Sequence, residues 1–258
     1  MELLNANNGM APAWSPDGCW IAFLSNREAG WDIFRMAADG TDIVRLTGGR
    51  ATEAPAWSAD GTQILFERDR KIDVVDAEGG EARTVIADAG WRSAPACRPG
   101  TEQFAFVHEG DIHLGEMTGS VLSRITSSGG AASPSWSPDG ESIAFSRSGA
   151  IWVVDVESGR ERRLTEGSED EEPAWAPDGE RIMFVRAASL WMTDAASGPP
   201  RPLPGVPEPA GSPTWAPDGE GLAFHAYQAG NWEIVVVRAD GAGARSLTEA
   251  TWISSRAD

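Results

Sequence analysis

One sequence pattern occurs six times along the chain and constrains its fold more than any other feature. Its most regular form is Pro-Ala-Trp-Ser-Pro-Asp-Gly, followed by a short apolar stretch that ends in Phe. The Trp position is occupied in successive copies by Trp14, Trp57, Cys97, Trp136, Trp175 and Trp215. The copies are about 40 residues apart, and a repeat of this length with four short strand-like runs is typical of a propeller blade. The pattern therefore predicts an all-β, six-bladed β-propeller with four antiparallel strands in each blade.

The residue types within one copy support this prediction. In the fourth copy, the segment 137–140 reads Ser-Pro-Asp-Gly, and these residues suit the successive positions of a tight turn. Runs enriched in β-branched and aromatic residues predict strands around it, at residues 133–136, 143–145, 151–154 and 162–165. No long helical period occurs in the chain. A four-stranded unit of this kind has an apolar face that it cannot bury alone, so neighbouring copies are expected to stack.

We assign all 258 residues to a single propeller domain. The expected blades lie approximately at residues 10–47, 53–86, 93–126, 132–165, 171–204 and 211–248, with a tail at 249–258. Because each blade can be built from contiguous sequence, Leu3-Leu4-Asn5 and Thr251-Trp252-Ile253 are expected to be closing or flanking segments. They are not expected to form a seventh blade.

The formal net charge is −18, from 21 basic and 39 acidic side chains. This balance argues against binding to nucleic acid and to anionic membrane surfaces, both of which require a basic surface. Solubility is one explanation of the acidity, and affinity for a cationic ligand or a basic partner is the other. We expect a monomer. We also expect no membrane insertion, because the N-terminal segment becomes polar within its first five residues and no transmembrane run follows. The compartment stays open: periplasmic or secreted if an export signal has been removed, and cytoplasmic otherwise.

The cysteines and histidines do not form a recognisable motif. Cys19 and Cys97 belong to different copies, so neither a disulfide nor a metal site is expected from them. His113 occupies a position that is aromatic in other copies, and we interpret it as a structural substitute. His108 and His225 are expected at the ends of second strands in different blades. A histidine-ligated lyase centre is the alternative to these structural roles.

The repeat resembles that of TolB-type propellers, which also occurs in the propeller domains of prolyl-oligopeptidase-like peptidases. The motifs that carry the resemblance are Trp-Ser-Pro-Asp-Gly, Ile-Ala-Phe, Trp-Asp-Ile and Arg-Leu-Thr, and they extend over essentially the whole chain. The third copy, at residues 95–100, departs from the pattern because it lacks both the Trp and the Asp-Gly turn. We find no counterpart of the α/β domain of TolB, of a hydrolase domain or of a Gly-x-Ser-x-Gly nucleophile motif. The resemblance implies a fold and a tendency to bind proteins or peptides, and it transfers no reaction.

One face of the predicted ring is the candidate recognition surface. Copies one and six have enlarged connections between their second and third strands, at residues 25–32 and 225–233, and ring closure makes these copies neighbours. Binding residues of rigid scaffolds often lie on such loops. We expect exposed aromatic and carboxylate side chains there, namely Trp31, Asp32, Tyr227, Trp232 and Glu233. The alternative is that the longer loops reflect only the original length of the repeat.

Acidic residues are expected near the axis on the same face. Glu53 stands two residues before Pro55, as Glu171 stands two residues before Pro173, and Glu172 adjoins it. We expect these carboxylates at the mouth of the central channel, where oxygen ligands suit Ca²⁺ or a cationic group. No loop of the EF-hand type is present in the sequence, and a solvated acidic loop is the alternative.

These observations favour a non-catalytic scaffold that binds a protein, a peptide or another ligand through the long-loop face and the channel mouth. This function needs no catalytic residue and no cofactor, and we lean away from an enzyme. The alternative is a metal-dependent hydrolase or lyase that acts on a sugar or a lactone at the propeller axis. Stoichiometric metal in the purified protein would favour the second function.

Overall fold

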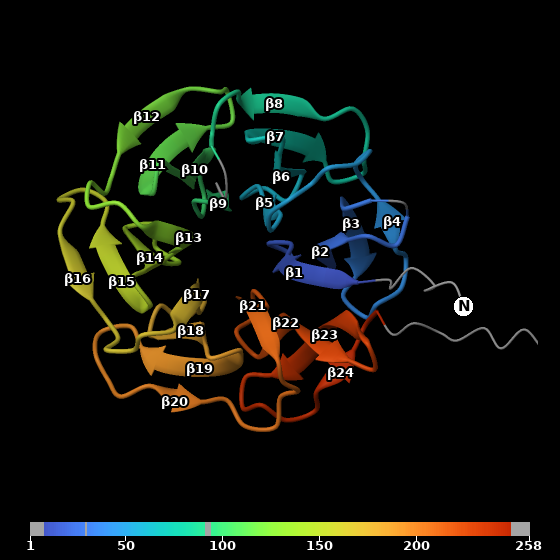
Figure 1. Cartoon of the computed structure of the whole chain (residues 1–258). Coiled ribbons are helices and arrows are strands. Elements are labelled where there is room, and N and C mark those ends of the chain that lie inside the picture. Colours follow the sequence, from blue (N-terminus) through green and yellow to red (C-terminus); the bar gives the residue numbers. More distant parts are fainter. Residues whose placement is uncertain (1–7, 29, 91–93, 249–258) are drawn as a thin grey trace, which may run out of the picture.

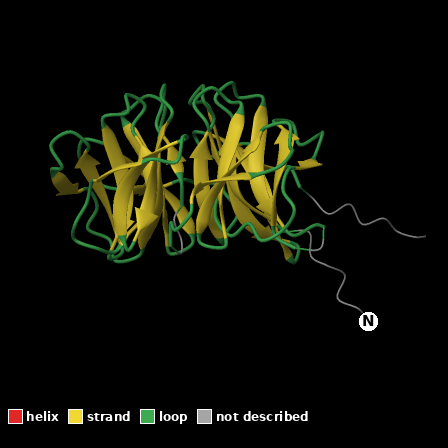
Figure 2. Ribbon diagram, turned by 90° about the horizontal axis from the view of Figure 1, so that it is seen from above, coloured by secondary structure: helices red, strands yellow, loops and turns green. Residues whose placement is uncertain are grey.

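The computed structural model describes residues 8–28, 30–90 and 94–248. Within these ranges the protein has six four-stranded antiparallel sheets and no helix. Figure 1 shows the sheets arranged around a central axis, and Figure 2 shows the loops at the two ends of the ring. The predicted all-β, six-bladed propeller with four antiparallel strands per blade is confirmed. The expected tail at 249–258 and the flanking segments at 3–5 and 251–253 lie outside the described residues.

Each blade is a simple meander of consecutive strands, with its first strand nearest the axis and its fourth strand at the rim (Figure 1). Blade 1 comprises β1 (Gly9–Trp14), β2 (Trp20–Ser25), β3 (Asp32–Ala37) and β4 (Val44–Arg45), and blade 2 comprises β5 (Ala56–Trp57), β6 (Gln63–Arg68), β7 (Lys71–Asp76) and β8 (Arg83–Ile86). Blade 3 comprises β9 (Ala96–Cys97), β10 (Gln103–His108), β11 (Asp111–Glu116) and β12 (Val121–Arg124), and blade 4 comprises β13 (Ala131–Trp136), β14 (Ser142–Arg147), β15 (Ala150–Asp155) and β16 (Glu161–Arg163). Blade 5 comprises β17 (Asp170–Trp175), β18 (Arg181–Arg186), β19 (Ser189–Asp194) and β20 (Arg201–Pro202), and blade 6 comprises β21 (Ala210–Trp215), β22 (Gly221–Gln228), β23 (Asn231–Arg238) and β24 (Arg245–Ser246).

The Ser-Pro-Asp-Gly turns join the first and second strands of the blades on one face of the ring, which we call the turn face. In blade 1, the Asp17 carboxylate accepts hydrogen bonds from the Ser15 hydroxyl (2.6 Å) and the Cys19 amide (2.9 Å). Gly18 follows with a φ of 72°, which a residue with a side chain rarely adopts. The opposite face carries the connections from second to third strands and between blades, and we call it the loop face.

The repeated Trp residues separate neighbouring blades. Their indole Nε1 atoms donate to backbone oxygens of the preceding blade at 2.9–3.1 Å, in the pairs Trp57–Ala13, Trp136–Ala96 and Trp215–Ala174. These three Trp side chains are buried. Burial of large aromatic groups between stacked sheets is a major source of stability in such a fold.

The ring closes between blade 1 and blade 6, where β1 packs against β21, β22 and β23. Asn8 connects the two blades at this seam. Its backbone amide donates to Asn26 Oδ1 (2.9 Å) in blade 1, and its own Oδ1 accepts from the Trp232 amide (3.0 Å) in blade 6. The sequence prediction that the first and last copies are neighbours is therefore confirmed.

The enlarged connection expected at residues 225–233 is instead mostly strand. β22 and β23 remain paired through Ala226–Glu233 and Tyr227–Trp232, so only Ala229 and Gly230 form the turn between them. The expectation of a long loop in blade 6 was wrong, because cross-strand aromatic pairing continues the ladder past its usual length. In blade 1 the connection between Ser25 and Asp32 does leave the ladder, as expected.

Within the described ranges, the protein contains no helix with the length and apolar character needed to cross a membrane.

Candidate functional site

A central cavity of about 780 Å³ runs along the propeller axis. The first strands of all six blades contribute to its wall, which consists mainly of Pro, Ala, Trp, Ser and Thr side chains. Ionisable side chains are few in this wall, and those among the described lining residues are Glu53, Cys97, Arg98, Glu172 and His225. The cavity is therefore an apolar channel with a small number of polar groups, which is the usual composition of a ligand site.

The charged groups lie at opposite ends of this channel. Arg98 stands directly after β9 at the turn face, and its guanidinium carbon lies 5.1 Å from the centroid of the Trp136 ring. Glu172 lies near the start of β17, at the loop face, and Glu53 precedes β5 at the same end. Among the described lining residues, the carboxylates thus lie toward the loop face and the guanidinium lies toward the turn face.

The position of Glu171 differs from the expectation that it lines the channel. The register of β17 shifts between Glu171 and Ala174, and Glu172 has a φ of 50° within this bulge. The extra residue turns the Glu172 side chain into the wall and leaves Glu171 exposed. The expectation for Glu171 was therefore wrong, whereas Glu53 and Glu172 do line the cavity.

Glu172 is held in place by the neighbouring blade. Its Oε2 atom accepts a hydrogen bond of 2.6 Å from the backbone amide of Ser212 in β21. Burial raises the pKa of the Glu172 carboxyl group, and the nearby Glu171 carboxylate adds to this effect. The group is a poorly solvated acceptor at the loop-face end of the channel, and a cation placed beside it would stabilise its charged form.

His225 also reaches the channel, and sequence reasoning missed this role. The side chain is 8% exposed, and its Nδ1 atom accepts a hydrogen bond of 3.4 Å from the Ala11 amide across the ring seam. Burial lowers the pKa of His225 to about 4, so the imidazole is neutral near pH 7. His225 pairs with Gly211, and a Cβ at Gly211 would lie only 2.7 Å from His225 Nε2.

The signal that could have revealed His225 is this glycine. In blades 1, 4 and 5, the corresponding cross-strand pairs are Met10–Leu24, Ala132–Ser146 and Glu171–Val185. Each of those pairs has a side chain on the first strand, whereas blade 6 has none. The combination of glycine and histidine at paired positions is specific to the sixth blade among these four.

The aromatic residues of the predicted recognition surface differ in accessibility. Tyr227 is 46% exposed, and its ring contacts the half-buried Trp232 ring at a centroid distance of 5.5 Å. Trp232 in turn contacts the His225 ring at 5.0 Å, edge to face. Trp31 is half-buried and packs against the apolar cluster between blades 1 and 2. An aromatic series therefore extends from the exposed Tyr227 to the channel wall at His225.

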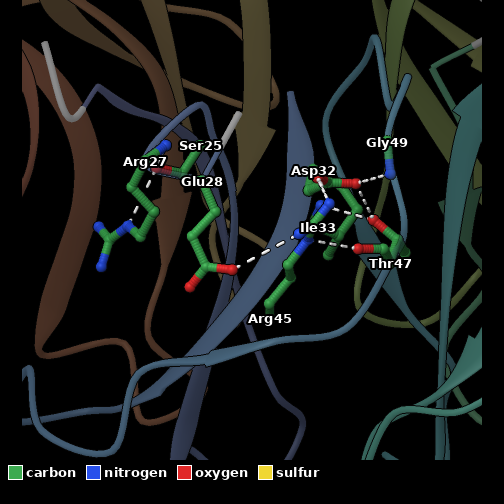
Figure 3. Close-up of polar contacts among 8 residues, drawn as sticks. All are labelled: Ser25, Arg27, Glu28, Asp32, Ile33, Arg45, Thr47 and Gly49. Carbon is green, nitrogen blue, oxygen red and sulfur yellow. Dashed lines mark hydrogen bonds and ion pairs between the residues drawn. The ribbon is translucent and has the colours of Figure 1, made fainter. Parts of the chain in front are cut away.

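Asp32 is not the exposed carboxylate that we expected. It is completely buried at the start of β3, where it accepts hydrogen bonds from Arg45 (2.6 Å), Thr47 Oγ1 (2.9 Å) and the Gly49 amide (Figure 3). Thr47 Oγ1 also accepts from the Ile33 amide. Asp32 therefore connects the third strand to the residues at and after the end of the fourth strand through hydrogen bonds. The expectation that it is available to a partner was wrong.

Glu233 has the same role in blade 6. It is 4% exposed and accepts a hydrogen bond of 2.5 Å from Thr248 Oγ1, whose oxygen accepts from the Ile234 amide. Asp111 and Thr126 repeat the arrangement in blade 3. The expectation that Glu233 is exposed was also wrong, because a carboxylate near the start of the third strand and the Thr that follows the fourth strand form a recurring structural contact.

Neither the histidine pair of blade 3 nor the cysteines form a recognisable centre. His113 lies opposite Phe106, in the aromatic position that the sequence predicted, and its ring contacts His108 at 5.4 Å. Both cysteines are free, with Cys19 exposed and Cys97 partly buried. In the described part of the chain, no group of three or more His, Cys, Asp or Glu side chains is arranged to hold a metal ion.

Comparison with known proteins shows that this architecture is similar to that of TolB-type propellers. A family model described as the TolB β-propeller domain matches residues 67–189. An uncharacterized protein of Agrobacterium fabrum, Atu1656, is 29% identical in an alignment 112 residues long, and the match covers 37% of this chain and 38% of that protein. The chain thus matches well under half of that relative's length.

Solved structures share the fold at low sequence identity. A putative TolB from Agrobacterium tumefaciens is similar with a TM-score of 0.72 and 21% identity, over 80% of this chain and 84% of that chain. TolB from Acinetobacter baumannii also has a TM-score of 0.72, with 18% identity over 91% of this chain and 62% of that chain. An oligogalacturonate lyase in complex with manganese is more distant, with a TM-score of 0.58 and 14% identity over 90% and 89% of the two chains.

Proposed function

We propose that this chain, a TolB-like six-bladed β-propeller, is a monomeric, non-catalytic scaffold that binds a protein or peptide partner at its loop face. The partner contacts the exposed hairpin of blade 6 and extends into the mouth of the axial channel. The observation that carries this proposal is the continuous path from the exposed Tyr227 through Trp232 to His225, which lines the channel. A partner could bury aromatic area outside the ring and satisfy polar groups within it.

The charge distribution favours a partner segment with basic residues. The chain has a net charge of −18, and Glu53 and Glu172 lie in the channel wall at the loop-face end. An exposed aromatic ring such as that of Tyr227 adds a surface on which a guanidinium or ammonium group can stack. Electrostatic attraction of this kind accelerates association and weakens as salt screens it over roughly 8–10 Å.

A photo-crosslinking experiment tests the location of the binding surface. Tyr227 is replaced by p-benzoylphenylalanine, the protein is irradiated in extract of its source cells, and crosslinked species are identified by mass spectrometry. Glu141, which is exposed in a turn-face loop of blade 4, carries the same photoreactive residue in the matched control. We expect one reproducible partner that crosslinks at position 227 and is lost when salt is raised.

A second variant tests whether the aromatic pair contributes to affinity. Trp232→Ala should reduce recovery of the partner that crosslinks at position 227. An alanine substitution of an exposed residue on the turn face should leave this recovery unchanged. If that partner crosslinks equally well from position 141, or if none crosslinks from position 227, the loop face is not the binding surface.

A further inference from the structure

The scaffold role alone does not explain why an imidazole and a carboxylate meet in the channel wall. His225 Nε2 and Glu172 Oε2 lie 2.7 Å and 3.3 Å from the point that a Cβ at Gly211 would occupy. They come from different blades, and the absence of a side chain at Gly211 is what allows both to approach. The two groups therefore form a compact polar site in a wall that is otherwise largely apolar.

The hydrogen bonds of each group define what remains available to a ligand. Because His225 Nδ1 accepts from the Ala11 amide, the proton of the neutral ring is on Nε2. Within the described residues, Nε2 has no hydrogen-bond partner, and the mostly buried side chain lines the channel. Glu172 Oε2 is bound by the Ser212 amide, and the Ser212 side chain also contacts this carboxylate. The site thus offers one N–H donor and one carboxylate acceptor.

We propose that Glu172 and His225 form a subsite for the protonated amino terminus of a peptide that enters the channel from the loop face. The α-ammonium group donates to Glu172, and the carbonyl oxygen of the first residue accepts from His225 Nε2. This inference rests on the proposed function, because it specifies which part of a peptide partner the channel receives.

The pairing of groups in the site selects an amino terminus over other cations. A lysine ammonium or an arginine guanidinium has donors only, so either would leave the His225 N–H without an acceptor. A peptide amino terminus has a cation and a carbonyl oxygen within one residue, so a single group satisfies both partners. A bound ligand covers the His225 N–H, and leaving this covered donor without an acceptor is costly, which provides the discrimination.

The charges around the site favour a peptide that enters the channel with its amino terminus first. Glu53 adds negative charge at the loop-face end of the channel, whereas Arg98 lies toward the turn face. A positively charged chain end is therefore attracted to the carboxylates at the loop-face mouth, and Arg98 disfavours its passage further along the channel wall. Burial of Glu172 raises the pKa of its carboxyl group, and an arriving ammonium group would reverse this effect.

Titration of the histidine ring signals with defined peptides tests the proposal. The full chain is labelled with ¹³C and ¹⁵N at histidine, and Ala-Ala-Ala-amide is added at pH 7 and low salt. The chain has three histidines, and His113 in blade 3 serves as the internal reference. We expect a saturable shift of the His225 signals without a shift of His113. N-acetyl-Ala-Ala-Ala-amide and Nα-acetyl-lysine-amide should bind at least about tenfold more weakly.

Two neighbouring glutamates provide matched variants. Glu172→Gln should abolish the shift, since it removes the negative charge but retains an oxygen for the Ser212 amide. Glu171→Gln changes net charge equally at an exposed position outside the wall and should leave the titration unchanged. Thermal melting of both variants confirms that they are folded before they are compared.

The proposal is overturned if the free and acetylated peptides bind equally, if the lysine derivative binds as tightly as the free tripeptide, or if neither peptide shifts His225. It is also overturned if Glu172→Gln retains the wild-type response. Failure here differs from failure of the scaffold role: a partner that still crosslinks at Tyr227 would keep the loop face as a binding surface that does not recognise a chain end.

Discussion

The Nδ1 atom of His225 accepts a hydrogen bond from the backbone amide of Ala11, a residue 214 positions away in the chain. This contact crosses the seam at which blade 6 meets blade 1. It keeps the imidazole in one tautomer and directs Nε2 toward the channel. A single side chain therefore contributes both to ring closure and to the polar lining of the axis.

The first prediction concerns pH. Burial lowers the pKa of His225 from 6.5 to about 4, so between these values the unfolded chain binds a proton that the folded chain does not. The free energy of unfolding should therefore fall as pH decreases from 6.5 toward 4, with a loss of about 2 kcal/mol at pH 5 from this group. Urea unfolding at pH 7 and pH 5 measures it.

The matched control is His225→Leu. Leucine is chosen because Leu24 occupies the corresponding position in blade 1. The contribution of Glu172 to the free energy of unfolding changes with pH in the opposite direction. Because the pKa of Glu172 is raised in the folded state, this contribution is present at low pH and is lost as pH rises. Comparing His225→Leu with the wild type isolates the histidine. An identical loss between pH 7 and pH 5 in both proteins would contradict the assignment.

The second prediction is that Asp32 stabilises the fold and does not bind a partner. Asp32→Ala removes an acceptor shared by Arg45 and Thr47, and should lower the free energy of unfolding by about 1–3 kcal/mol. Asp88→Ala, which breaks an exposed ion pair with Arg70, should cost less than about 1 kcal/mol. Chemical denaturation measures the free energy of unfolding of both variants. Equal losses would argue against a stabilising role of the contacts that Asp32 makes with Arg45 and Thr47.

The third prediction separates Trp residues between blades from those at the loop face. Trp136 is buried and donates to Ala96 in the preceding blade, so Trp136→Ala should cost about 3–5 kcal/mol of stability. Trp232 is half-buried beside Tyr227, so Trp232→Ala should cost less and should mainly weaken crosslinking of the partner. Equal destabilisation by the two changes would show that Trp232 belongs to the core.

The fourth prediction concerns the two thiols. Burial raises the pKa of Cys97 to about 12, whereas Cys19 is exposed on the turn face. Because the thiolate is the reactive form, Ellman's reagent at pH 8 should modify Cys19 in the folded protein much faster than Cys97. Cys19→Ser removes the fast phase in the control, and urea should make the remaining thiol reactive. A persistent fast phase in Cys19→Ser would contradict this prediction.

Much of the fold could be predicted from local sequence. The turn chemistry of Ser15-Pro16-Asp17-Gly18 and its copies sets the ends of strands, and the period near 40 residues requires stacking of blades. The position of His113 opposite Phe106 also followed from aligning the copies. These features depend on residues that are close in the chain or that occupy equivalent places in the repeat.

The candidate site could be predicted only in part, because its residues meet across blades. The sequence indicated carboxylates near the axis, but the bulge in β17 selects Glu172 over Glu171. Asp32 and Glu233 look like exposed acids beside aromatic residues, yet each is buried against a threonine 15 positions along the chain. His225 reaches the channel because Gly211, on the paired strand, has no side chain. A repeat pattern specifies what every blade shares, whereas packing between blades specifies where individual side chains point, and the candidate site depends on the second.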